Sequence, residues 1–134
     1  MNISDSLDAL RGKFSGCLTV AYADISTGMV LSASAQAHLN QEHLDALCTT
    51  ASEMLAGGTA RRFSAVLAGD QEEDIQQAII FESSEVGLFY KSTSSPNEAL
   101  CCACLPDIDL AEFSRQARTH FKALEAMFQD DDGS

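Results

Sequence analysis

Residues 97–106, NEALCCACLP, carry three of the chain's five cysteines within four positions, and residues 99–105 include no charged side chain. A strand that is apolar at every position, rather than at every second one, is covered on both of its faces. Residues 17–23, CLTVAYA, are likewise apolar at nearly every position. Because interior strands show this pattern, we expect the two segments to lie side by side in the centre of a sheet with helices on both faces.

Shorter segments on either side of these two predict the remaining strands. Residues 24–28, DISTG, have the composition of a turn and lead into a strand over 29–34. Two further strands, over 75–82 and 86–92, are joined to each other and to a last strand over 98–105 by short, turn-rich connections. The strand over 75–82 is mixed in polarity, which indicates a position at the edge of the sheet.

Capping residues and apolar stripes at helical spacing predict the helices before the third strand. Ser4 is the predicted cap of the first helix, in which apolar residues recur every three or four positions. Asn40 is the predicted cap of a second helix over 41–57, with one apolar stripe and a glycine pair at its end. A further short helix over 61–68 is supported by propensity alone.

Asp109 and Glu112 have the spacing of a capping box and begin the last helix, whose apolar stripe continues over five turns. The length of 134 residues suits one domain. We therefore assign residues 1–128 to a single domain and residues 129–134 to an acidic disordered tail. The order α-β-β-α-β-β-β-α predicts an α+β fold, an α/β sandwich with helices on both faces of a five-stranded antiparallel sheet.

The chain is strongly acidic, with 20 Asp and Glu against eight Lys and Arg and a net charge of −12. Such a charge repels phosphate backbones and anionic membranes, so we expect no nucleic-acid or membrane partner. The sequence has no 18-residue apolar run and begins without a signal-peptide pattern. A cytoplasmic protein with reduced thiols is the expectation from these features.

An apolar edge strand exposes unpaired backbone groups, which invite a second strand. A symmetric dimer that joins two such edges removes this liability. The second helix also has an uncharged flank of mostly small residues beside its core stripe. The predicted dimer interface consists of Ala46, Thr50, Met54, Gly57, Ile75, Gln77, Ile79 and Phe81. The alternative is a monomer with a slightly apolar helix flank.

Three segments together resemble the roadblock/dynein light chain family: SGCLTVAYADISTGMVLSAS at 15–34, HLDALCTTASEMLAGG at 43–58, and GLFYKSTSSPNEALCCACLPDIDLAEF at 87–113. The resemblance implies a profilin/longin-like fold and dimers formed through the second helix and the third strand. It also implies a scaffold role, with motor complexes and Ras-like small GTPases among the partners. The cysteine run departs from a typical member.

The five cysteines have two interpretations. On a strand, Cys102 and Cys104 point to one face and Cys101 to the other, so the three cannot converge on one metal ion. We predict that all five are buried thiols, namely Cys17, Cys48, Cys101, Cys102 and Cys104. The open question is whether Cys17 lies close enough to the others to share a proton, a bond or a metal.

The sequence contains no phosphate-loop, dinucleotide-binding or zinc-protease motif. We therefore predict no catalytic residue, no metal and no cofactor, and a protein that is not an enzyme. The leading hypothesis is a homodimeric interaction or scaffold module, possible partners being a second copy and a Ras-like small GTPase. The alternative is a profilin-like small-ligand sensor, or a redox or metal sensor that uses the cysteine-rich strand.

Overall fold

The computed structural model of the chain describes residues 3–38, 40–56, 76–92, 94–95 and 97–132. The predicted short helix over 61–68 lies outside these residues. The described elements are α1 (Ile3–Gly12), β1 (Cys17–Asp24), β2 (Met29–Ala35), α2 (Gln41–Leu55), β3 (Gln77–Phe81), β4 (Val86–Lys91), β5 (Glu98–Cys104) and α4 (Leu110–Asp132).

The described strands form one antiparallel sheet in the order β2-β1-β5-β4-β3. The two mostly apolar strands, β1 and β5, are neighbours in its centre, as their sequences predicted. Their register places Cys17 opposite Cys104 and Tyr22 opposite Leu100. The mixed strand β3 is at one edge and β2 is at the other, which confirms the five-stranded α+β fold.

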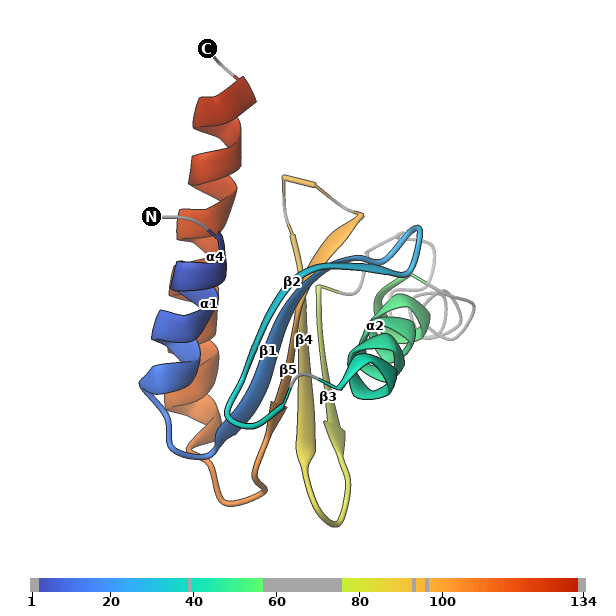
Figure 1. Cartoon of the computed structure of the whole chain (residues 1–134), viewed down its shortest axis with the longest axis vertical. Coiled ribbons are helices and arrows are strands. Elements are labelled where there is room, and N and C mark those ends of the chain that lie inside the picture. Colours follow the sequence, from blue (N-terminus) through green and yellow to red (C-terminus); the bar gives the residue numbers. More distant parts are fainter. Residues whose placement is uncertain (1–2, 39, 57–75, 93, 96, 133–134) are drawn as a thin grey trace, which may run out of the picture.

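The helices lie on both faces of this sheet, α1 and α4 on one side and α2 on the other (Figure 1). Alternation along β5 divides its side chains between two cores. Leu100, Cys102 and Cys104 pack beneath α1 and α4, whereas Cys101 and Ala103 pack beneath α2. Every one of these side chains is fully buried, so β5 holds both layers of helices to the sheet.

Local hydrogen bonds explain where the elements begin and turn. Asn40 Oδ1 accepts the backbone N–H of His43 at 3.2 Å, which confirms the predicted cap of α2. In the turn between β1 and β2, Asp24 Oδ1 accepts the backbone N–H of Ser26 at 2.9 Å. Gly28 closes this turn with a φ of 75°, a conformation that favours glycine.

Two helix ends differ from the predicted ones. α1 already includes Ile3, which packs against the core beneath α1 and α4, so Ser4 lies inside the helix and is not its cap. α4 continues to Asp132, beyond the last apolar position of its stripe. The division of the chain at residue 128 stays a prediction. None of the described helices is both long and apolar enough to cross a lipid bilayer.

The small side chains of β5 allow the helices to approach the sheet closely, and this can be tested by enlarging one of them. We expect Ala103→Leu to lower the free energy of unfolding by about 1–3 kcal/mol, because Ala103 is fully buried in the core beneath α2 and a larger side chain overpacks it. Ala123→Leu, on the exposed side of α4, is the matched control and should change stability by less than about 0.5 kcal/mol. Urea unfolding of both variants makes the comparison.

Candidate functional site

The strand β3 has one free side among the described strands, because it pairs only with β4. The register between them is unbroken from Gln77 opposite Tyr90 to Phe81 opposite Val86. Just beyond its two ends, Lys91 N–H donates to Gln76 O and Glu82 N–H donates to Glu85 O.

Hydrogen-bonded and open positions alternate along an antiparallel strand. Because hydrogen bonds to β4 are formed at Gln76 and Glu82, the backbone groups of every second residue between them, Ala78 and Ile80, also face β4. The backbone groups of Gln77, Ile79 and Phe81 then point outward, away from β4. These three residues belong to the predicted interface, and their N–H and C=O groups are the ones a second strand would meet.

The opposite edge of the sheet, β2, is less suited to pairing. Its register with β1 shifts between Tyr22 and Ala23, leaving Leu31 as an extra residue, and such a bulge twists an edge away from flat pairing. In addition, α1 packs along β2, where Arg11 Nε donates to Ser34 Oγ at 2.8 Å. Of the two described edges, β3 is therefore the one with an unbroken register.

The side chains of β3 alternate between the two faces of the sheet. Ala78 and Ile80 pack toward α2. Ile79 and Phe81 point to the face that carries α4, but α4 lies over the more central strands and leaves them 37% and 69% exposed. The edge strand thus presents two apolar side chains to solvent beside its outward backbone groups.

On the other face, a groove of about 210 Å³ separates α2 from the β3–β4 hairpin. Ala46 and Thr50 line it from α2, and Ile80 lines it from β3. Thr50 Oγ1 donates to Ala46 O at 2.9 Å, so the hydroxyl group has its partner within the helix and can be covered without loss. Its further lining residues are His43, Leu47, Glu82, Glu85, Gly87 and Phe89.

A polar contact marks one side of this groove, since His43 Nε2 lies 3.5 Å from Glu85 Oε1. The rest of the flank carries no charge: Ala46 is exposed, whereas Thr50 and Met54 are half-buried. These residues follow each other at helical spacing, so they form one strip along α2 that faces the β3 side of the sheet.

The described residues of the predicted interface thus lie on two neighbouring elements, the strip on α2 and the outer edge of β3. Gly57 and Ile75 lie outside the described residues. Sequence reasoning missed Ile80, which lines the groove between the strip on α2 and β3. The alternation of side chains along the strand would have indicated that Ile80 points toward α2. Whether these surfaces bind a second copy stays a prediction, which is developed below.

All five cysteines are buried and unbridged. Cys17 lies opposite Cys104 on the neighbouring strand, and the two thiols share a hydrogen bond that lowers the pKa of Cys17 and raises that of Cys104. On the other face, Cys48 of α2 packs in the same core as Cys101, whose pKa is raised by burial. This answers the open question for Cys17 and divides the thiols between two cores.

The thiols do not form a metal centre in the part of the chain that the structure describes, because no three His, Cys, Asp or Glu side chains converge there. A nucleophilic thiol needs exposure and a depressed pKa. Cys101, Cys102 and Cys104 have raised pKa values, mainly through burial for the first two and the bond to Cys17 for the third. The arrangement is that of a packed core.

Comparison with solved structures identifies the architecture. A roadblock/LC7 domain from Streptomyces avermitilis superimposes with a TM-score of 0.77, at 16% identity over 96% of this chain and 99% of that chain. The chain has the roadblock fold. Myxococcus xanthus MglB matches with a TM-score of 0.73, at 16% identity over 96% of this chain and 95% of that one.

A structure described as MglB with tetrameric arrangement also has the roadblock fold of this chain, with a TM-score of 0.75 at 12% identity over 94% of this chain and 87% of that one. No protein-family model matches the sequence, and no curated protein matches it. At these identities the comparisons show a shared fold.

Burial predicts how the five thiols react. We expect the native protein to react with a soluble aromatic disulfide reagent at least about 100-fold more slowly than a small free thiol, because all five side chains are shielded. All five should react at once after denaturation. Absorbance of the released thiolate follows both reactions. A single thiol that reacts rapidly in the native protein would support the sensor hypothesis instead.

Proposed function

We propose that the chain is a non-enzymatic interaction module that forms a homodimer through the β3 edge and the uncharged strip on α2. The observation that carries this proposal is the regular edge of β3, with outward backbone groups and exposed Ile79 and Phe81. A second β3 strand, placed antiparallel, would pair the outward groups and join two sheets into one. This arrangement removes the edge of both copies.

The two faces of such a dimer would be closed by different contacts. On the α4 side, Ile79 and Phe81 would be covered by the same residues of the second copy. On the α2 side, the strip of Ala46, Thr50 and Met54 would let two α2 helices approach, because it has small or flexible side chains and no charge. A stable interface covers about 800 Å² on each partner, which a strand and a helix together can supply.

For the role of the dimer, we propose a scaffold that regulates or assembles a Ras-like small GTPase in the cytoplasm. The resemblance of the sequence to the roadblock/dynein light chain family supports this proposal, as does the fold shared with MglB. One MglB structure is described as a tetrameric arrangement, so self-association occurs on this fold. A binding role also agrees with the shielded thiols, none of which is exposed for chemistry.

A charge placed on the β3 edge tests the dimer. We expect Ile79→Lys to raise the dissociation constant of the dimer at least roughly 100-fold, because two ammonium groups would face each other at the twofold axis. Leu31→Lys, on the opposite edge β2, introduces the same charge at a 47% exposed leucine and should leave association unchanged. Sedimentation velocity over a range of concentrations measures both variants.

Three results would contradict the dimer: a monomeric wild-type protein at micromolar concentration, an Ile79→Lys variant that associates normally, or equal effects at both edges. Circular dichroism of each variant checks that the fold is kept. The GTPase role has a separate test, in which the dimer is added to a Ras-like GTPase of the same genome and release of a fluorescent guanine nucleotide is followed. Unchanged nucleotide release and hydrolysis would reject GTPase regulation.

A further inference from the structure

The few basic residues of this acidic chain are unevenly distributed. Arg115, Arg118 and Lys122 account for three of the eight Lys and Arg, and all three are exposed on α4 at spacings of three and four residues. Residues at these spacings share one side of a helix. Positive charge therefore gathers in a single stripe on a protein with a net charge of −12.

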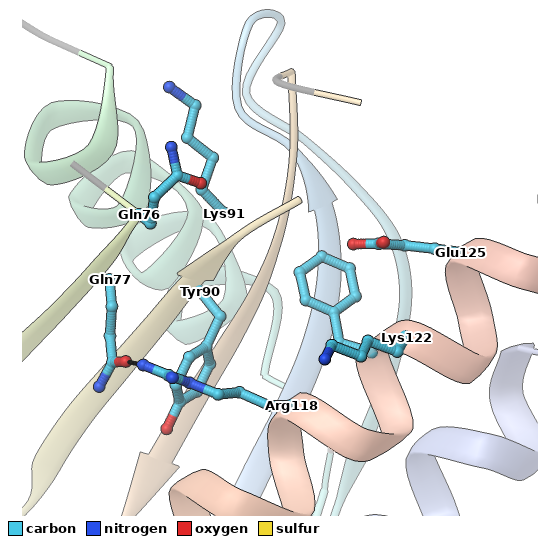
Figure 2. A pocket seen from close by; sticks show the side chains of 8 residues that line it. Gln76, Gln77, Tyr90, Lys91, Arg118, Lys122 and Glu125 are labelled. Carbon is cyan, nitrogen blue, oxygen red and sulfur yellow. Dashed lines mark hydrogen bonds between the residues drawn. The ribbon is translucent and has the colours of Figure 1, made fainter. Parts of the chain in front are cut away.

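This stripe lies beside a hollow of about 230 Å³ between α4 and the strands β3 and β4 (Figure 2). Tyr90 and Phe121, which are almost fully buried, lie at the floor of the hollow, and Arg118 and Lys122 line it from α4. A second hollow of about 490 Å³, along the outer side of α4, is also lined by Arg118 and Lys122. Arg118 and Lys122 thus line both hollows, which we call together the α4 groove.

Hydrogen bonds hold the walls of the α4 groove in place. The Arg118 guanidinium donates to Gln77 Oε1 across the hollow, which connects α4 with the start of β3 (Figure 2). Tyr90 Oη and Ser114 Oγ lie 2.8 Å apart. Burial raises the pKa of Tyr90, so its hydroxyl group stays protonated and can remain in this bond. The groove is therefore built between two bridged elements.

A carboxylate near each end of the stripe offsets part of its positive charge. Glu112 pairs with Arg115, whose Nε lies 3.0 Å from Glu112 Oε2. Glu125 accepts a hydrogen bond from Ser92 Oγ at 3.0 Å near the other end of the hollow. Between them, Arg118 contacts a neutral amide, so its positive charge and that of Lys122 dominate the centre of the groove.

We propose that the α4 groove docks an acidic segment of a partner protein, with carboxylates on Arg118 and Lys122 and an apolar side chain beside Tyr90 and Phe121. The stripe from Arg115 to Lys122 extends over about 10 Å of helix, which exceeds a single carboxylate or phosphate group and suits a peptide. Three exposed cations on so acidic a chain are too few to hold a nucleic acid or a membrane against the overall repulsion.

The α4 groove and the proposed dimer surface meet at the start of β3, because Gln77 accepts a hydrogen bond from Arg118 in the groove and also belongs to the predicted interface. The groove is on the α4 face of the sheet, whereas the strip of Ala46, Thr50 and Met54 is on the α2 face. Arg118 and Lys122 belong to α4 and not to the dimer surface, so peptide docking needs no dimer. If both hold, a dimer presents two such grooves on one face of its joined sheet.

The probe for this proposal is a fluorescein-labelled synthetic peptide of six glutamates around one central phenylalanine. Fluorescence anisotropy at low salt should show saturable binding with a dissociation constant of about 10⁻⁵ to 10⁻⁴ M. Lys122→Glu should weaken binding at least roughly tenfold, whereas Lys13→Glu, which makes the same change in net charge just after α1 and outside the lining of the groove, should weaken it by less than about threefold. Replacing the phenylalanine with serine should also weaken binding, since the hollow loses its apolar occupant.

Several results would overturn the proposal. One is the absence of saturable binding at about 1 mM protein, and another is equal weakening by Lys122→Glu and Lys13→Glu, which would leave only an effect of total charge. Tighter binding of anionic vesicles or of a single-stranded oligonucleotide than of the peptide would assign the surface to another occupant. The Ile79→Lys variant should bind the peptide at least as tightly as the wild type does, because it adds a cation to the α4 face of β3, and this separates the test from that of the dimer.

Discussion

The pairing of β1 with β5 is the constraint on which the rest of the structure depends. Both strands are apolar on both faces, so neither can lie at an edge or leave one face in water without exposing a large apolar surface. Their pairing forces helices onto both sides of the sheet, and alanines and cysteines at the contact let those helices approach closely. It also assigns β3 to an edge, because the remaining strands can only be added outside the central pair.

The two edges that result are unequal, and the difference determines how the protein can associate. The bulge at Leu31 and the packing of α1 protect β2, whereas β3 keeps a regular register and open backbone groups. The proposed dimer surface follows from this asymmetry. The α4 groove has another origin, since it arises where α4 leaves β3 uncovered and Arg118 reaches across to Gln77. One sheet thus carries two candidate surfaces for partners, which adjoin at Gln77.

Much of this architecture was predictable because local patterns and tertiary structure agree in the centre of the sheet. The strands around Cys17 and Cys101, their adjacency, and the cap at Asn40 follow from burial and capping rules. The bulge at Leu31 and the groove beside Arg118 were not predicted, since both depend on how distant elements meet and leave no periodic signal. Ile3 extended α1 beyond its predicted cap because its contact with the core outweighed the propensity of Ser4.

The central claim is that the open backbone groups of β3 pair with a second copy, and amide hydrogen exchange measures those groups directly. In a dimer joined through β3, the N–H groups of Ile79 and Phe81 are hydrogen-bonded and buried, so their exchange should slow as the protein concentration is raised through the dissociation constant. The N–H of Ile80, already bonded within the sheet, provides the internal reference. Rapid exchange of Ile79 and Phe81 at every concentration would contradict the claim.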